Sequence, residues 1–231
     1  MKKLITFILI ALMATPTFAQ YETSRKRSRY NHSDTERYYG LRLGINLSVL
    51  NSGDVDYDMN VRPGISLGAV YGMQLANSTP IWLEGGLFYS EKGGEQKNPA
   101  NAEVEKITCR LAYLEVPVVL KYSLDVADDL YVQPFLGGFF ALGVGGKTKI
   151  YTRDHDKRVS ESSFDRINVN SIKTSYAGLN RLDAGLRLGC GIEYQMVYAE
   201  MGFDFGLANI GKDEFQSVRT QTLFFNIGVN F

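Results

Sequence analysis

RLDAGLRLGCGIEYQMVYAEMGFDFGL, from Arg181 to Leu207, is the stretch of sequence that decides the fold. Every second side chain from Leu182 to Tyr194 is apolar, and the side chains between them are charged or are glycine. The same alternation resumes from Val197 to Leu207, after a break near Gln195. Because successive side chains of a β-strand point to opposite faces, this period of two predicts two strands joined by a tight turn, with one wholly apolar face.

Six further segments carry the same alternation over about ten residues or more, enough for a tilted strand to cross a membrane. They run near Tyr39 to Ser48, Gly64 to Leu75, Ile81 to Ser90, Arg110 to Tyr122, Leu130 to Val144 and Thr220 to Phe231. The connections alternate between short and long, and the longest runs from about Gly146 to Asn180. Short turns on one side and long loops on the other are typical of outer-membrane barrels. The sequence therefore predicts an all-β, eight-stranded antiparallel up-and-down transmembrane β-barrel over residues 38–231.

A soluble lipocalin-like barrel, with the apolar face inside, is the competing interpretation. An eight-stranded barrel is just wide enough for its inward side chains, so a full set of Leu, Ile, Tyr and Phe would overpack it. Glycine, which suits a crowded interior, recurs on the polar face instead. These positions are Gly68, Gly72, Gly86, Gly137, Gly185, Gly189, Gly191, Gly202, Gly206 and Gly228. The apolar face carries no charged residue in the strand cores, so we expect it to face lipid.

The N-terminal part is expected to lie outside the barrel. Lys2 and Lys3, an apolar run from Leu4 to Ala14 and the small-residue pattern Thr17-Phe18-Ala19 predict that residues 1–19 are a cleaved signal peptide. Residues 20–37 are polar and carry a cluster of cations, so we expect a flexible basic periplasmic arm, either solvated or in contact with lipid phosphates or a partner. The whole chain has 25 basic and 25 acidic residues, and this balance indicates no nucleic-acid partner.

The polar face of the predicted strands holds the candidate site residues. They are Arg42, Glu84, Glu115, Lys121, Asp183, Arg187, Glu193, Glu200 and Asp204, and we also expect Arg181 in the lumen. Charges confined in so narrow a space must pair or stay hydrated. We therefore predict a network of internal salt bridges that fills a closed barrel with little conductance. A path for protons or ions is the alternative.

Chemistry outside the lumen has weaker signals. The chain has two histidines, His32 and His155, and the latter lies near Asp154, Asp156 and Ser160 in the longest loop. Adjacency in a hydrophilic loop does not make a catalytic triad, and one loop histidine does not make a zinc site. We expect no enzymatic activity, no cofactor and no metal site. Asp54, Asp56, Asp58 and Asn60 alternate in the first loop and leave weak Ca²⁺ binding open, although the glycine and glutamate of an EF-hand are missing.

Two further sets of residues bear on the chemistry outside the lumen. Cys109 and Cys190 lie on predicted strands that are not neighbours, so we expect two unpaired cysteines that pack as small apolar side chains. A cluster of cations in the longest loop would face either lipopolysaccharide phosphates or the medium. Its members are Lys147, Lys149, Arg153, Lys157 and Arg158.

Three motifs resemble the PorT-like outer-membrane β-barrel family of Bacteroidetes. They are YLEVPVVLKY (Tyr113 to Tyr122), GLRLGIN (Gly40 to Asn46) and DAGLRLGCGIE (Asp183 to Glu193), and the resemblance covers Tyr38 to Phe231. It implies an eight-stranded barrel. The namesake of the family is needed for type nine protein secretion, so the resemblance also implies a secretion accessory as the alternative to a structural or interaction role, our leading expectation.

Partners are expected from the same comparison. The terminal Phe231 resembles the C-terminal aromatic residue that barrel-assembly machinery recognises in outer-membrane proteins. The partners implied are this machinery, outer-membrane lipid and lipopolysaccharide, and, for the alternative function, proteins of the secretion system.

Overall fold

The computed structural model describes residues 36–52, 59–76, 79–97, 103–153, 158–169, 174–176, 178–212 and 217–231. All of them belong to one compact unit, Thr35–Phe231. The expected signal peptide (residues 1–19) and residues 20–35 of the expected arm lie outside the described residues. Among the residues that are described, no helix is long and apolar enough to cross a membrane.

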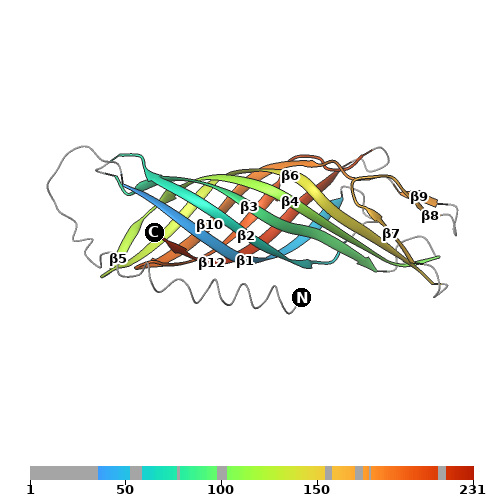
Figure 1. Cartoon of the computed structure of the whole chain (residues 1–231), viewed down its shortest axis with the longest axis horizontal. Helices are drawn as coiled ribbons and strands as arrows, with labels where there is room; N and C mark the ends of the chain where they lie inside the picture. The colour runs from blue at the N-terminus through green and yellow to red at the C-terminus, as the bar shows by residue number, and fades with distance from the viewer. Residues whose placement is uncertain are drawn as a thin grey trace, which may run out of the picture. The chain divides into compact units, whose positions relative to one another are not determined.

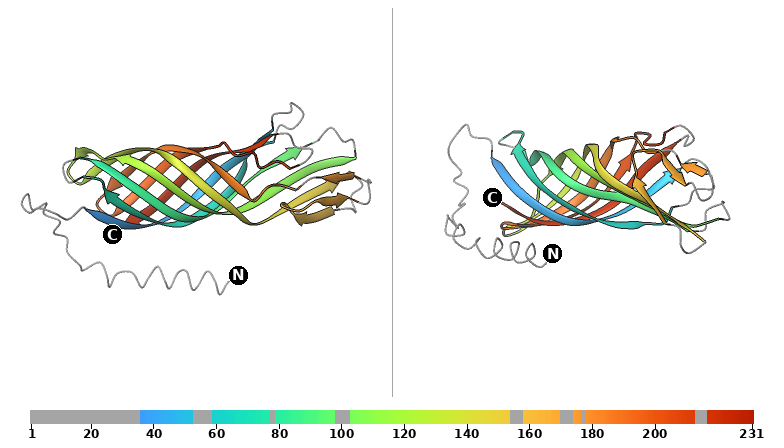
Figure 2. Two further views of the ribbon diagram at one scale, coloured as in Figure 1. Left: turned by 90° about the horizontal axis from the view of Figure 1, so that it is seen from above. Right: turned by 45° about the vertical axis from the view of Figure 1, so that its right-hand side comes forward.

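Eight long strands form a closed barrel wall (Figures 1 and 2). They are β1 (Arg37–Ser52), β2 (Arg62–Gln74), β3 (Ile81–Lys97), β4 (Val104–Tyr122), β6 (Leu130–Thr152), β10 (Leu182–Tyr194), β11 (Val197–Gly206) and β12 (Val218–Asn230). Each pairs antiparallel with its neighbour in the order β10-β11-β12-β1-β2-β3-β4-β6, and β6 pairs with β10 to close the ring. The expected eight-stranded antiparallel barrel is confirmed.

The short connections gather at one end of the barrel, which we call the turn end; the opposite end is the loop end. Two turn residues, Asp129 and Gln195, adopt left-handed φ values of 60° and 55°. The C-terminus lies at the turn end as well (Figure 1). There the backbone N–H of Phe231 donates to the carbonyl of Tyr39 at 2.7 Å, so the last residue seals the seam between the first and last strands.

The longest connection differs from the expected loop. Strand β6 continues to Thr152, and the segment that follows contains β7 (Arg158–Ser162), β8 (Ile167–Val169) and β9 (Thr174–Tyr176). Strand β7 pairs with β6, and β8 pairs with β9. A short strand, β5 (Leu124–Ala127), also lies in the expected turn between β4 and β6. The expected end of this strand near Val144 was wrong, because the outward side chains beyond the apolar belt are charged. The apolar alternation therefore ends before the strand does.

Burial decides which face is outside. On β10 the apolar side chains of Leu186 and Ile192 are 49% and 51% exposed, whereas Asp183 and Arg187 are 2% and 7% exposed. The other barrel strands sort in the same way, with large apolar residues outside. Such a surface is stable only in contact with lipid. The soluble lipocalin-like alternative is therefore excluded by the arrangement of the side chains.

Candidate functional site in the barrel lumen

The buried charges of the lumen separate into two groups along the barrel. The turn-end network contains Arg42, Glu84, Lys121 and Glu200, and the loop-end network contains Lys92, Glu115, Arg187 and Asp204. Every member sits on an inward position of a barrel strand, because side chains at every second residue face the lumen. With Tyr38 and Tyr198 included, the turn-end network draws its side chains from four of the eight strands, β1, β3, β4 and β11.

The turn-end network is centred on Glu84. Lys121 Nζ donates to Glu84 Oε2 and to the hydroxyl of Tyr198, both at 2.8 Å. The hydroxyl of Tyr38 donates to the same carboxylate at 2.5 Å. The guanidinium of Arg42 lies 3.7 Å from Glu84 Oε2 and 4.1 Å from the centre of the Tyr198 ring. This one carboxylate is therefore surrounded by two cations and a hydroxyl donor, which offsets its removal from water.

The loop-end network is centred on Arg187. Its Nε and Nη2 donate to the two oxygens of Asp204, each at 2.7 Å, and Nη2 also donates to Glu115 Oε1 at 2.5 Å. Lys92 Nζ lies 2.6 Å from Glu115 Oε2 and 3.8 Å from Asp204 Oδ2. All four side chains are at most 8% exposed. Two cations and two carboxylates thus neutralise each other in a closed four-residue arrangement.

Three expected lumen residues have other partners. Glu193 accepts hydrogen bonds from Gln133 at 3.0 Å and from Asn230 at 3.1 Å, and Asp183 accepts one from Thr220 at 2.7 Å. Glu200 accepts one from Asn226 at 2.8 Å and lies 4.0 Å from Lys121 Nζ. The structure therefore places these carboxylates in the lumen, held mainly by neutral donors.

Arg181 and Lys92 differ from the expectations. Arg181 precedes the first residue of β10 and is exposed at the loop end, with its guanidinium 4.7 Å from the Phe164 ring centre, so its expected place in the lumen was wrong. Lys92 was missed because the expected strand ended at Ser90. It continues the inward alternation of Glu84, Phe88 and Ser90, and this was the signal that could have identified it.

Aromatic side chains fill the space between the two networks. Phe135 and Phe224 stack with their ring centres 6.4 Å apart, and Phe88 and Val119 are buried at the same level of the barrel. A cavity of about 10 Å³ lies among them, bordered by Glu84 and Arg187, one from each network. A space of that size holds about one water molecule. Buried side chains therefore occupy most of the bore at this level.

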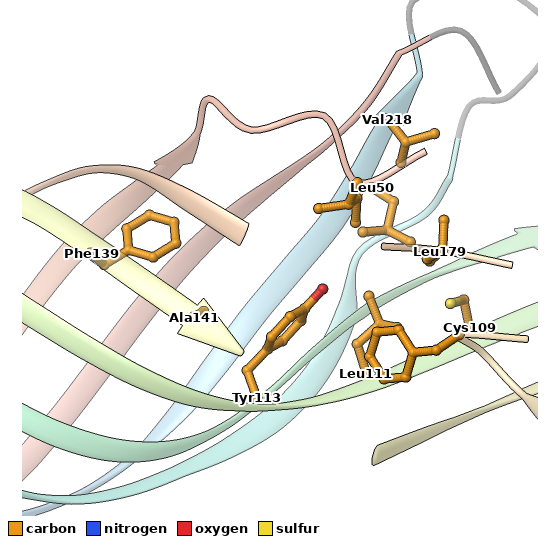
Figure 3. Close-up of a cluster of buried hydrophobic side chains, with 10 residues drawn as sticks. Leu50, Cys109, Leu111, Tyr113, Phe139, Ala141, Leu179 and Val218 are labelled. Carbon is orange, nitrogen blue, oxygen red and sulfur yellow. The ribbon is translucent and has the colours of Figure 1, made fainter. Parts of the chain in front are cut away.

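An apolar cluster, which we call the cap, closes the loop end of the barrel (Figure 3). It consists of Leu50, Cys109, Leu111, Tyr113, Phe139, Ala141, Phe164, Leu179, Ile210 and Val218. Phe164, Leu179 and Ile210 come from the connections, and the others come from the wall strands. Lys212 Nζ donates a hydrogen bond to the carbonyl oxygen of Phe164 at 3.3 Å, and the backbone N–H of Leu179 donates one to the carbonyl oxygen of Ser163 at 2.9 Å. Connecting segments therefore fold inward and are tied down over the bore.

Cys109 lies in the cap, beyond the lipid-facing part of β4. It is 4% exposed and accepts a hydrogen bond from the Thr148 hydroxyl at 3.6 Å. Burial raises the pKa of the Cys109 thiol. Both Cys109 and Cys190 are free thiols, so the expected absence of a disulfide agrees with the structure.

The remaining candidates from the sequence fall largely outside the described residues. This applies to His32, His155, Asp154, Asp156 and Lys157, and to Asp54, Asp56 and Asp58 of the possible Ca²⁺ loop. Asn60 forms an isolated bridge with Glu95, and Ser160 is exposed on β7. Within the described part of the chain, no group of three or more His, Cys, Asp or Glu side chains is arranged to hold a metal ion.

Comparisons with known proteins give one family match. The model of the family described as "Outer membrane protein beta-barrel domain" matches residues 15–211. No curated protein matches the chain significantly.

Several solved structures are similar at low identity. Ail, the attachment invasion locus protein of Yersinia pestis, is 14% identical, with 85% of this chain and 99% of that chain covered and a TM-score of 0.42. Neisserial surface protein A is 14% identical, with 84% and 97% covered and a TM-score of 0.41. The translocator domain of the autotransporter NalP from Neisseria meningitidis is 8% identical, with 98% of both chains covered and a TM-score of 0.32.

Proposed function

Because the chain belongs to the outer membrane protein beta-barrel domain family, we propose that it serves the outer membrane as a structural or interaction protein and does not pass solutes. The observation that carries this proposal is the filled lumen. Two ion-pair networks and a layer of aromatic rings occupy the bore, and the cap covers its loop end. An open pore would need a continuous hydrated path, and a cavity for about one water molecule does not provide it.

Conductance in planar bilayers tests this proposal. We expect the purified full-length protein to give no stable openings. A Phe164→Ala variant, which opens the cap but leaves both networks in place, should also stay closed, because the aromatic layer lies below the cap. A steady conductance in the nanosiemens range from the wild type would overturn the proposal. An ion selectivity that differs between the wild type and a Glu84→Gln variant would also overturn it, because ions would then pass through the lumen.

A second proposal is an accessory role in type nine protein secretion. It is supported by the three motifs that resemble the PorT-like family, in particular Tyr113 to Tyr122. In this role the loops or turns would bind other secretion proteins. Deletion of the chain in its native host, with quantitative comparison of extracellular and periplasmic proteins, tests it. Cargo that accumulates in the periplasm and is released on complementation supports the role, whereas unchanged secretion removes it.

Export and assembly form part of the same proposal. We propose that residues 1–19 are removed by signal cleavage, that Phe231 is read by the barrel-assembly machinery, and that the chain catalyses no reaction. N-terminal sequencing of the mature protein should find Gln20 first.

A Phe231→Ala variant should reach the outer membrane in smaller amounts than a control Met196→Ala variant at the same end of the barrel. Equal amounts would remove the assembly role of Phe231.

A further inference from the structure

The outward face of the sheet at the loop end carries two cations directly opposite each other. Arg110 on β4 and Lys147 on β6 are paired residues in the antiparallel register, and both are exposed. Lys149 follows two residues later on the same face. Directly opposed side chains in such a pair have their Cβ atoms about 4.5–5.5 Å apart, and like charges there destabilise the sheet. A repulsive pair needs a compensating anion to be favourable.

The protein itself supplies no such anion among the described residues. No carboxylate in the described part of the chain lies within 4.0 Å of the nitrogens of Arg110, Lys147 or Lys149. Glu95, on the same face of β3, is 2.8 Å from Lys106 and 3.9 Å from Lys97. Glu95 is therefore engaged by other cations. Glu91, the diagonal neighbour of Arg110 on β3, accepts a hydrogen bond from Tyr89 at 3.3 Å, and no described carboxylate forms an ion pair with the opposed cations.

Neutral hydrogen-bond donors border the cations. Ser162 of β7 is paired with Lys147, and Ser160 of β7 is paired with Lys149. The hydroxyls therefore lie on the same face as the lysines, because directly paired residues point to the same side of a sheet. A planar guanidinium, two ammonium groups and hydroxyl donors together match the oxygens of a phosphate group. We call Arg110, Lys147, Lys149, Ser160 and Ser162 the basic patch.

The basic patch lies at the edge of the lipid-facing belt. Leu114 and Val116 point outward on β4 and are 40% and 42% exposed, and Arg110 follows on the same face toward the loop end. On β6, Leu142 and Val144 face outward just before the strand reaches Lys147. Long connections of outer-membrane barrels face the outside of the cell. The patch is thus at the depth of the outer-leaflet headgroups.

We propose that the basic patch binds the phosphate groups of an outer-leaflet phosphoglycolipid, a lipid A of the lipopolysaccharide type. The acyl chains of the same lipid would lie on the adjoining belt residues, so one molecule would contact both surfaces. The inference needs only the place of the barrel in the outer membrane, and it stands or falls separately from the secretion role. The proposed site keeps Lys147 and Lys149 of the basic cluster expected from the sequence and adds Arg110, which the sheet places opposite Lys147.

The test uses the full-length protein in phosphatidylcholine vesicles, with and without bisphosphorylated lipid A. We compare the wild type with an Arg110→Gln/Lys147→Gln variant. The matched control is Arg37→Gln/Arg219→Gln, which also removes two exposed cations but on β1 and β12. Binding is measured as the lipid A retained by the purified barrel, and stability as the midpoint of unfolding in urea.

The difference in stability between the patch variant and the wild type should change sign when lipid A is added. Without lipid A, the patch variant should be as stable as the wild type or more so, because the repulsion is gone. With lipid A, the wild type should gain stability, while the variant should gain little and should bind about thirtyfold more weakly, given the usual contribution of each cation at an anionic membrane surface. The control variant should behave as the wild type does.

Three outcomes would overturn the proposal. Equal retention of lipid A by the patch variant and the control would show that the patch is not the site. An equal gain with dephosphorylated lipid A would show that the acyl chains alone are recognised. A gain produced by inorganic phosphate in plain phosphatidylcholine vesicles, with no further gain from lipid A, would identify a site for free phosphate and not for lipid.

Discussion

Arg187 and Asp204 face each other across the β10–β11 pair and form a two-pronged ion pair, with both nitrogen–oxygen distances at 2.7 Å. Their place opposite each other in the register follows from the short turn at Gln195 and Met196, which fixes the pairing of the two strands. The pair therefore connects the geometry of the turn end with the charge balance of the lumen at the loop end.

Removal of one partner of this pair should be much more harmful than removal of both. Arg187→Met removes the guanidinium that pairs with the Asp204 carboxylate and should lower the free energy of unfolding by about 3–5 kcal/mol. Arg187→Met/Asp204→Leu should recover much of this loss, because Lys92 still neutralises Glu115 at 2.6 Å. Urea unfolding in phospholipid vesicles measures both. A single variant within about 0.5 kcal/mol of the wild type would show that the pair is not structurally important.

Space in the lumen should limit substitution at Gly202. A Cβ added there would overlap the Phe224 ring and would lie 2.7 Å from the carbonyl oxygen of Leu188. Gly202→Ala should therefore destabilise the barrel by about 1–3 kcal/mol through overpacking. Gly145→Ala is the control, since no atom lies within 4 Å of a Cβ at that position. Similar effects of the two substitutions on the urea midpoint would refute the explanation.

The lipid-facing belt should reject charge. Leu188 points outward in the middle of β10, and Leu188→Arg should cost about 2–4 kcal/mol of folding free energy in a bilayer. Glu161→Arg, an exposed position on β7, should change stability by no more than about 0.5 kcal/mol. The free energies of unfolding of the two variants are measured in the same phospholipid vesicles. A neutral Leu188→Arg would contradict contact of this face with lipid.

The β10–β11 turn should tolerate glycine better than its native residue. Gln195 has φ of 55°, in the left-handed region where a side chain is strained. Gln195→Gly should stabilise the barrel by about 0.5–1 kcal/mol, because the backbone hydrogen bond from Gln195 N–H to the Asp129 carbonyl is kept. Met196→Gly has no strained φ to relieve and should give no gain. Stabilisation by both changes would point to a cause other than φ.

The cap should protect Cys109 from reaction. Burial raises the pKa of its thiol, so the fraction of reactive thiolate at pH 8 is smaller than for an ordinary cysteine, and it increases only as the pH rises toward the raised pKa. In a Cys190→Ser background, alkylation by a polar maleimide should be slow at pH 8. Phe164→Ala should speed it at least about tenfold by opening the cap, whereas Glu161→Ala should not. Equal rates in the two variants would show that Phe164 does not cover the thiol.

The alternation of side chains was sufficient to predict the barrel. Which face of a strand a residue occupies is fixed by its parity, and parity is a local property that the sequence displays directly. The outward Leu186 and Ile192 and the inward Arg187 could therefore be predicted without coordinates. The same holds for the crowding at inward glycines such as Gly202, since the small bore of an eight-stranded barrel follows from the strand number.

Only the tertiary structure decided which charges pair and how the ends are closed. The salt bridge from Lys92 to Glu115 depends on the register of β3 against β4, and the contact of Arg187 with Glu115 depends on the curvature of the wall. The sequence alone determined that charges lie inside and apolar residues outside, because that choice needs only parity and the solvent on each side. Phe164 in the cap, Arg181 outside the lumen and the opposition of Arg110 to Lys147 depend on contacts between residues distant in sequence, and parity does not specify these.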